Sequence, residues 1–211
     1  NLIRRGIDEH KISVVLNGVD TQRFAPRKSD KNFAHKVGLD DKFVVGYIGT
    51  HGMAHALMNV LEAATRLLDR KEIAFLMVGG GAERDMLIQE AELRNLKNVI
   101  FLERQPKDRM PVVWSLCDIA LVHLKNSPVF EEVIPSKMFE AMAMGLPILL
   151  ASPPGEASDI LAADRAGIHV PAEDPEALAN SVLRLYKDTN LLSEFATASL
   201  AAAPHHTREA Q

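Results

Sequence analysis

Continuous apolar runs of strand length alternate along this chain with segments of helical periodicity, and this alternation constrains the fold more than any other feature. Apolar residues recur three and four positions apart over residues 53–69 and 82–93, as on one face of a helix. The strand-length runs are apolar throughout, so both faces of each strand are expected to be buried. These runs cover residues 12–16, 43–48, 73–78, 99–102, 119–122, 147–151 and 168–170. The pattern predicts an α/β fold, a Rossmann-like, doubly wound parallel sheet with helices on both faces.

The chain is expected to divide into a connection with an entering strand, a main α/β domain, and a C-terminal helix with a tail. The parts are assigned to residues 1–41, 42–190 and 191–211. The first boundary follows from residues 25–42, which are charged and weakly periodic. Asp174 and Pro175 are typical of a helix start, and that helix is expected to run to about residue 187. Because the sequence opens at Asn1 without an initiator methionine, we expect it to be a fragment of a longer chain.

Composition excludes several classes of protein. The 211 residues are 47% hydrophobic and 25% charged, close to globular averages, which excludes disorder. The formal net charge of -4 argues against a nucleic-acid partner. Cys117 is the single cysteine, so a disulfide framework and a multi-cysteine metal site are excluded, and the eight histidines form no spacing typical of a metal site. With no apolar run long enough to span a bilayer, a cytoplasmic location is expected.

Ligands of open parallel sheets bind beyond the carboxyl ends of the strands, so the loops that follow the predicted strands are the place to look for a site. Residues 79–81 are three glycines, but they match neither the dinucleotide-binding fingerprint nor a P-loop. A tight strand-to-helix turn explains them better. The same interpretation applies to residues 49–52, where Thr50 and His51 add polar groups that diphosphate oxygens would meet.

The segment 131–147 is the most informative. Pro135 and Ser136 indicate a helix entrance, and Glu140 lies about one turn into the helix, where its two oxygens are suited to the vicinal diol of a ribose. At the same helix mouth, Lys137 is suited to neutralise a phosphate, and Ser136 to cap the helix or donate to a phosphate oxygen. A structural interpretation explains the same residues, with Glu140 as favourable helix-end electrostatics and Lys137 as a solvated surface charge. The residues alone leave both interpretations open.

These residues also carry a resemblance to a known family. Glu132 and Glu140, with seven residues between them and Ala-Met-Ala-Met-Gly-Leu-Pro following, resemble the hallmark of retaining glycosyltransferases of the family-4 type, whose fold is called GT-B. Residues 12–26, with Asn-Gly-Val-Asp at 17–20, are similar to the segment through which such enzymes enter their second domain. Residues 134–140 resemble the branch that builds bacterial surface polysaccharides, often from UDP-linked amino sugars. The resemblance covers nearly the whole chain.

The resemblance implies a role for each matching residue. Glu140 would hold the ribose hydroxyls, and Glu132 would lie near the donor sugar as the catalytic residue. Lys137 and the amides around Ser136 would face the diphosphate. The other donor-binding residues implied in this way are Gly49 and Thr50, in the glycine turn under the diphosphate, and Arg104 and Gln105, in the loop that contacts the base.

The sequence departs from the family pattern in two places. Leu16 replaces a proline, which is a minor change. Many members carry an arginine and a lysine after the first core strand, where this chain has only His51 and His55 to offer charge. Diphosphate affinity is therefore expected to depend on Lys137 and helix amides, with the two histidines either contributing or acting as ordinary loop residues.

The resemblance implies the C-terminal, donor-binding half of a retaining glycosyltransferase. The expected donor is a nucleotide-diphosphate sugar, UDP-linked, and the expected acceptor is lipid-linked or a saccharide, in bacterial polysaccharide or glycolipid synthesis. No metal or cofactor is expected. The acceptor domain would be the missing N-terminal part of the same chain, through which the enzyme would reach the inner face of the membrane, and the fragment would be inactive alone. The alternatives are a nucleotide-sugar epimerase or phosphorylase of the same architecture and a non-catalytic nucleotide-binding domain.

Overall fold

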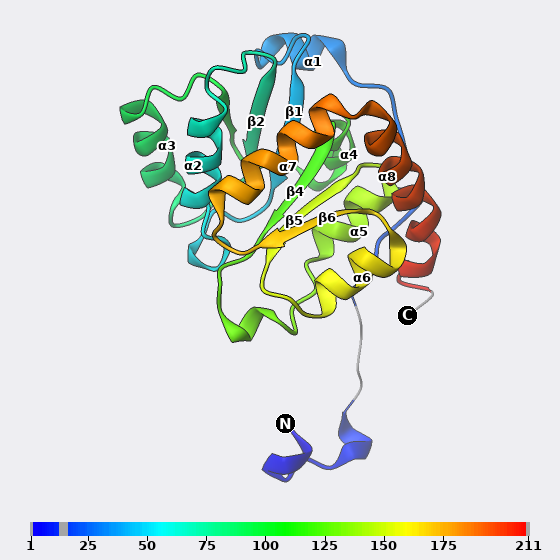
Figure 1. Cartoon of the computed structure of the whole chain (residues 1–211). Coiled ribbons are helices and arrows are strands. Elements are labelled where there is room, and N and C mark those ends of the chain that lie inside the picture. The colour runs from blue at the N-terminus through cyan, green and yellow to red at the C-terminus, as the bar shows by residue number, and fades with distance from the viewer. Residues whose placement is uncertain (1, 13–16, 210–211) are drawn as a thin grey trace.

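A computed structural model describes residues 2–12 and 17–209, and its core is one sheet of six parallel strands (Figure 1). The strands are β1 (Phe43–Ile48), β2 (Ile73–Val78), β3 (Val99–Leu102), β4 (Ile119–His123), β5 (Ile148–Ser152) and β6 (Gly167–Pro171). Their order across the sheet is β3-β2-β1-β4-β5-β6. The chain thus builds outward in one direction from β1 to β3, then returns to the other side of β1 with β4. This reversal creates a switch point between β1 and β4, where ligands of such sheets bind.

Helices cover both faces of the sheet (Figure 1). They are α1 (Lys31–Lys36), α2 (Met58–Arg66), α3 (Arg84–Leu93), α4 (Met110–Trp114), α5 (Ser136–Ala143), α6 (Glu156–Asp164), α7 (Pro175–Lys187) and α8 (Thr189–Ala202). Helices α2, α3 and α7 pack in one apolar cluster with Val45 and Phe75, and α4, α5 and α6 pack in another with Val44 and Leu76. Alternate residues of each strand therefore enter opposite cores, which explains why the strand sequences are apolar throughout.

The predicted fold class is confirmed, and so are the six predicted strands from residue 43 onward, because burial on both faces leaves a clear signature in the sequence. The predicted strand over 12–16 falls on residues 13–16, which lie outside the described residues. The predicted helix start at Asp174 is also confirmed, since its side chain accepts a hydrogen bond of 2.8 Å from the Ala177 amide. Residues 25–42, expected to be a connection, contain α1, and Phe33 of α1 packs against the core.

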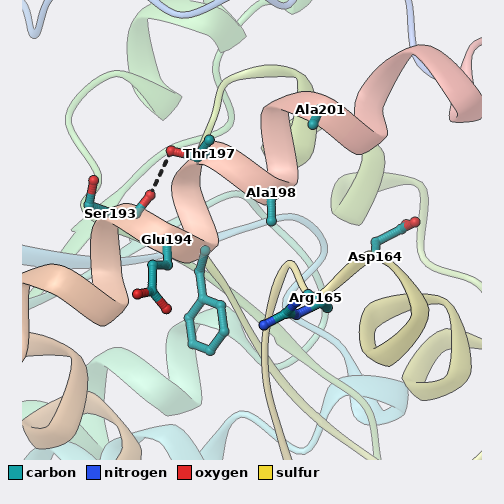
Figure 2. Close-up of a pocket in the computed structure, with 8 residues that line it drawn as sticks. Asp164, Arg165, Ser193, Glu194, Thr197, Ala198 and Ala201 are labelled. Atoms are coloured by element: carbon teal, nitrogen blue, oxygen red, sulfur yellow. Dashed lines mark hydrogen bonds between the residues drawn. The ribbon is translucent and has the colours of Figure 1, made fainter.

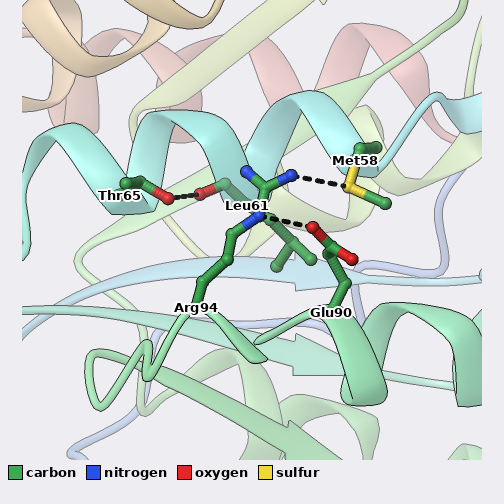
Figure 3. A network of polar contacts seen from close by, with 5 residues as sticks. All are labelled: Met58, Leu61, Thr65, Glu90 and Arg94. Carbon is green, nitrogen blue, oxygen red and sulfur yellow. Dashed lines mark hydrogen bonds and ion pairs between the residues drawn. The ribbon is translucent and has the colours of Figure 1, made fainter. Parts of the chain in front are cut away.

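Polar contacts fix α3 to α2 (Figure 3). Arg94, which caps the C-terminal end of α3, donates to Glu90 at 2.6 Å and to the Met58 sulfur at 3.7 Å. Thr65 donates back to the Leu61 carbonyl within α2. Because Met58 begins α2, these contacts tie the start of that helix to α3.

The first and last described segments of the domain lie side by side. Val19 forms a parallel bridge with Thr207, and its amide donates to the His206 carbonyl at 2.9 Å. His206 in turn stacks on Phe139 of α5, with ring centroids 4.5 Å apart, and pairs with Asp164 of α6 at 2.6 Å. Residues near both ends of the domain thus brace the helix that carries the candidate site. Within residues 2–12 and 17–209, no helix has the length and apolar character needed to cross a membrane.

Candidate nucleotide-binding site at the switch point

Backbone contacts join the loops that follow β1 and β2. The Gly49 amide donates to the Val78 carbonyl, and the His51 amide donates to the Gly80 carbonyl, both at 2.9 Å. A Cβ atom on Gly79, at φ 148°, would overlap the Gly49 carbonyl oxygen. The interpretation of the three glycines as a tight turn that serves positive φ and close packing is therefore confirmed for Gly79.

Lys137 lies in the first turn of α5, and its side chain reaches Gly49, the residue that follows β1. Its Nζ atom lies 4.1 Å from the centre of the Tyr47 ring, and a Cβ atom on Gly49 would lie 2.5 Å from it. The Nζ atom is buried and has no hydrogen-bond partner in the described part of the chain. Burial lowers the pKa of Lys137 to about 8, although Glu140 acts in the opposite direction. The interpretation of Lys137 as a solvated surface lysine is therefore wrong.

Glu140 lies one turn further along α5, on the same side of the helix as Lys137. It is half-buried, and its Oε2 atom accepts a hydrogen bond of 3.3 Å from the Trp114 indole. Burial raises the pKa of Glu140, while the Trp114 bond and the charges of Lys137, Arg208 and Arg23 lower it. The cationic surroundings thus oppose the larger effect of burial on the pKa, and the carboxylate oxygens can accept further hydrogen bonds.

Three histidines surround the same point. His51 is fully buried, and neither of its ring nitrogens has a hydrogen-bond partner among the described residues. His123, at the end of β4, is also fully buried, and its Nε2 atom lies 2.7 Å from the Asn59 amide nitrogen. His55 is half-buried, with Nδ1 3.2 Å from the His123 carbonyl oxygen. Burial, followed by nearby cationic groups, lowers the pKa of both His51 and His123 to about 4, although the hydrogen bond to His55 acts in the opposite direction on His123.

Three further predicted residues are exposed in the loops at the carboxyl ends of the strands. Thr50 is exposed, and its carbonyl accepts a 2.8 Å hydrogen bond from the Tyr47 hydroxyl. Ser136 is the exposed first residue of α5, with Pro135 in the capping position. Glu132 is exposed in the loop before α5.

Arg104 and Gln105 follow β3, which is the edge strand and is separated from β1 by β2. Arg104 is exposed, and Gln105 donates to the Glu103 carbonyl at 3.0 Å. The structure thus brings Gly49, Lys137 and Glu140 together at the switch point. It leaves Arg104 and Gln105 two strands away, at the same end of the sheet.

Sequence reasoning missed Tyr47, His123 and Asn59, which together hold Lys137 and His55 in place. Tyr47 and His123 lie in apolar strands and look like ordinary core residues. The one available signal is position, because His123 is the last residue of β4, at the carboxyl end where ligands bind.

Two surface hollows differ in their relation to this site. The larger, of 610 Å³, is lined by Asp164, Arg165 and residues of α8 (Figure 2). Because Asp164 and Arg165 immediately precede β6, this hollow lies toward the amino ends of the strands, away from the candidate site. The second, of 450 Å³, is lined by Asn59 and Glu83, among others, and by Lys125, which follows β4. Since Asn59 contacts His123, this second hollow adjoins the histidines.

Among the residues that the structure describes, no group of three or more His, Cys, Asp or Glu side chains is placed to hold a metal ion. The groups that gather at the switch point are an ammonium, a carboxylate and imidazoles. Because the Lys137 ammonium has no hydrogen-bond partner within residues 2–12 and 17–209, the arrangement is suited to an anionic ligand that also carries hydroxyl groups.

Solved structures share this fold. A crystal structure of HepE from Anabaena in complex with UDP and glucose superposes with a TM-score of 0.81 at 23% identity, covering 97% of this chain and 55% of that one. The C-terminal domain of LpcC, a glycosyl transferase group 1 family protein from Francisella tularensis, superposes with a TM-score of 0.75 at 20% identity. That comparison covers 90% of this chain and 99% of the LpcC domain.

Curated relatives are similar in sequence as well. The putative colanic acid biosynthesis glycosyl transferase WcaI of Escherichia coli is 35% identical over 106 residues, which are 50% of this chain and 26% of WcaI. The D-inositol 3-phosphate glycosyltransferase of Corynebacterium urealyticum is 27% identical over 200 residues, covering 88% of this chain and 46% of the relative. The chain thus spans half or less of the length of these relatives. The family model for glycosyl transferases group 1 matches residues 29–200, and the chain belongs to this family.

Proposed function

We propose that this chain binds a nucleotide-diphosphate sugar, UDP-linked, at the switch point between β1 and β4, as the donor-binding half of a retaining glycosyltransferase. The observation that carries the proposal is Lys137, whose buried ammonium covers the Tyr47 ring, has no hydrogen-bond partner among the described residues and lies against the Gly49 turn. A buried charge without a partner is costly, and a diphosphate would supply the missing opposite charge. The complex of HepE with UDP and glucose, in a protein of the same fold, supports the choice of nucleotide.

The proposed chemistry follows from the placement of the charges. When the bond between the sugar and the diphosphate breaks, negative charge develops on the leaving diphosphate. Lys137, together with free amides at the start of α5, would stabilise that charge without a metal ion. Glu140 would accept hydrogen bonds from the ribose hydroxyls, which fixes the nucleotide relative to Lys137. Glu132, exposed in the loop before α5, would position the donor sugar. The acceptor hydroxyl would attack from the face that the diphosphate leaves, and its proton would pass to the leaving diphosphate.

The acceptor side belongs to the proposal for the whole protein. Because this chain spans only part of its relatives, we propose that an N-terminal domain completes the cleft and holds a lipid-linked or saccharide acceptor. The relation to WcaI, a putative colanic acid biosynthesis glycosyl transferase, supports a role in bacterial polysaccharide synthesis. We propose polysaccharide or glycolipid synthesis as the role, with the donor bound on the cytoplasmic side. The 211-residue chain would then bind the donor and transfer little.

Calorimetric titration of the 211-residue chain with UDP, GDP and ADP tests the proposal. Binding of UDP is expected to be selective. Replacing Glu140 by glutamine removes the charged acceptor of the ribose hydroxyls, and replacing Lys137 by methionine removes the charge against the diphosphate. Each change is expected to weaken UDP binding by about ten- to a hundredfold, since a hydrogen bond to a charged group contributes about 1.5 to 3 kcal/mol.

The matched controls lie on the exposed end of α3 and in the turn that follows it. Glu92→Gln and Lys97→Met make the same chemical changes at exposed positions and are expected to leave the affinity for UDP unchanged. Equal affinity for UDP in the wild type, Glu140→Gln and Lys137→Met would show that nucleotide binds elsewhere and would overturn the proposed site.

A further inference from the structure

His55 lies beside the ring that Lys137 covers, as a second group that can become cationic. The centres of the His55 and Tyr47 rings are 6.0 Å apart with an interplanar angle of 63°, so the imidazole meets the tyrosine edge-on. Lys137 Nζ lies 4.1 Å from the centre of the same Tyr47 ring. Lys137 also acts electrostatically on the pKa of His55, the partly exposed member of the three histidines, so we expect an anion that pairs with Lys137 to arrive close to His55.

The tautomer of His55 follows from its hydrogen bond. Its Nδ1 atom lies 3.2 Å from the His123 carbonyl oxygen, which can only accept, so Nδ1 carries the proton in the neutral ring. The Nε2 atom is then the one that lacks a proton and can take one up. The bond to His123 also fixes the orientation of the ring, as a positioned ligand requires.

Burial and the nearby charge of Lys137 favour the neutral form of His55 in the free protein. Burial lowers the pKa of His55 below its ordinary value of 6.5, and the Lys137 ammonium lowers it further, while the His123 carbonyl acts in the opposite direction. An arriving anion raises the pKa of His55, because its negative charge stabilises the protonated ring and offsets the effect of Lys137.

The other titratable groups packed around His55 do not supply a negative charge that would stabilise its protonated ring. His51 on the same loop and His123 on β4 both have their pKa lowered to about 4 by burial, with cationic neighbours that include Arg84 for His51 and Lys137 for both. Burial raises the pKa of Tyr47, so it stays neutral. The acidic groups act on the neighbours of His55: Glu83 raises the pKa of Tyr47, and Glu140 raises the pKa of Lys137.

We propose that His55 is a further ligand of the bound diphosphate and that it binds by taking up a proton at Nε2. The proposal rests on the proposed function, which supplies the anion. The ring is neutral before binding, and on binding Nε2 gains a proton from solvent and donates a charge-assisted hydrogen bond to a phosphate oxygen. Donor affinity is thereby linked to pH, and it falls as pH rises through the interval between the pKa of the free and of the bound state.

Calorimetric titration of the 211-residue chain with UDP-glucose, in buffers of different ionisation enthalpy, measures the proton uptake. UDP-glucose is the probe because both of its phosphates are substituted, so its own charge is constant between pH 6 and pH 8. Lys137, with a pKa of about 8, is largely charged already at pH 6.5. The wild type is expected to take up a fraction of a proton at pH 6.5 to 7, and its affinity is expected to fall by up to about tenfold per pH unit above the free pKa of His55.

Two variants of His55 isolate the effect. His55→Asn keeps a donor in the place of Nδ1 for the His123 carbonyl but cannot titrate, and it is expected to bind weakly at every pH without proton uptake. His55→Lys carries a fixed charge and is expected to retain affinity at pH 8, also without uptake, so it tests the proposal if the asparagine variant folds poorly. His205→Asn, at an exposed position in the short helix Ala203–His206, is the control and is expected to behave as the wild type.

The outcomes separate this proposal from the proposed function. UDP-glucose binding that is lost in Lys137→Met but shows no proton uptake in the wild type would overturn the role of His55 and leave the proposed site intact. Uptake that persists in His55→Asn and disappears in His51→Asn would assign the proton to His51 and also overturn it. If UDP-glucose fails to bind at pH 6.5 and at pH 8, the proposed function is wrong, and the role of His55 is overturned with it.

Discussion

At the scale of the residue, the buried ammonium of Lys137 lowers the stability of the fold, while the same charge is the proposed partner of the diphosphate. Its pKa of about 8 in the folded chain is lower than the ordinary 10.5, so the folded state disfavours the charged form. Below pH 8 the lysine is charged in both the folded and the unfolded state, and its burial destabilises the fold by about 3 kcal/mol. Between pH 8 and 10.5 the unfolded chain holds more protons, so this destabilisation is relieved as pH rises.

We therefore expect Lys137→Met to increase the free energy of unfolding at pH 7 while it weakens UDP binding. Methionine keeps the length of the buried stem and removes the charge. The gain is expected to be about 3 kcal/mol at pH 7 and to shrink toward pH 9.5. Urea unfolding of both proteins at the two pH values measures it, with Lys97→Met as the exposed control. A gain that is the same at both pH values would contradict a charge-based explanation.

The candidate site could be predicted from the sequence only for residues at the start of a helix, where the helix dipole and free amides favour binding of an anion. Lys137 and Glu140 stand at a helix mouth, where a cation and a carboxylate at this spacing face one side, so they could be named in advance. The burial of Lys137 against Tyr47 could not, because it depends on how β1 and α5 pack across the sheet. For the same reason the contact between His123 and Asn59 could not be predicted, since it joins residues far apart in the sequence.

At the scale of the element, the turn after β2 fixes how closely the loops after β1 and β2 approach. Gly79→Ala is expected to lower the free energy of unfolding by at least about 2 kcal/mol, because its Cβ would overlap the Gly49 carbonyl oxygen at a backbone φ of 148°. It is also expected to weaken UDP binding, since the Gly49 turn lies under Lys137. Urea unfolding and calorimetry measure the two effects.

Gly80→Ala is the matched control for that change. A Cβ on Gly80 would meet no atom within 4 Å, so we expect little change in stability or in UDP affinity. Similar losses in the two variants would show that the close approach of Gly79 to Gly49 is not what limits substitution in this turn.

The elements themselves were predictable to different degrees. The described strands could be found because burial on both faces gives continuous apolar runs, and α7 because Asp174 and Pro175 mark its start. Helices α1 and α4 span only 6 and 5 residues, too few for a period to emerge. Such short helices are stabilised by packing, as with Phe33 of α1 on the core, and packing is not visible in local sequence.

At the scale of the whole molecule, His206 connects the last described segment to the helices of the second core. His206→Ala removes the stack on Phe139 and the contact with Asp164, and is expected to cost about 2 kcal/mol. For a domain of this size the melting temperature should fall by roughly 4 to 8 °C. Thermal unfolding measures this, and His205→Ala, next to it but exposed, should melt like the wild type. Equal melting temperatures for all three proteins would contradict the bracing role.

The bridge between Val19 and Thr207 also determines how the molecule meets mechanical force. The two segments run parallel, so tension applied between residue 17 and residue 209 shears this bridge and stretches the backbone hydrogen bonds of Val19 together. The six-stranded sheet lies outside the direct line of that tension. The bridge would therefore break first, and the stacking of His206 on Phe139 would be lost with it. Helix α5, which bears Lys137 and Glu140, would then lack this support while the sheet is still intact.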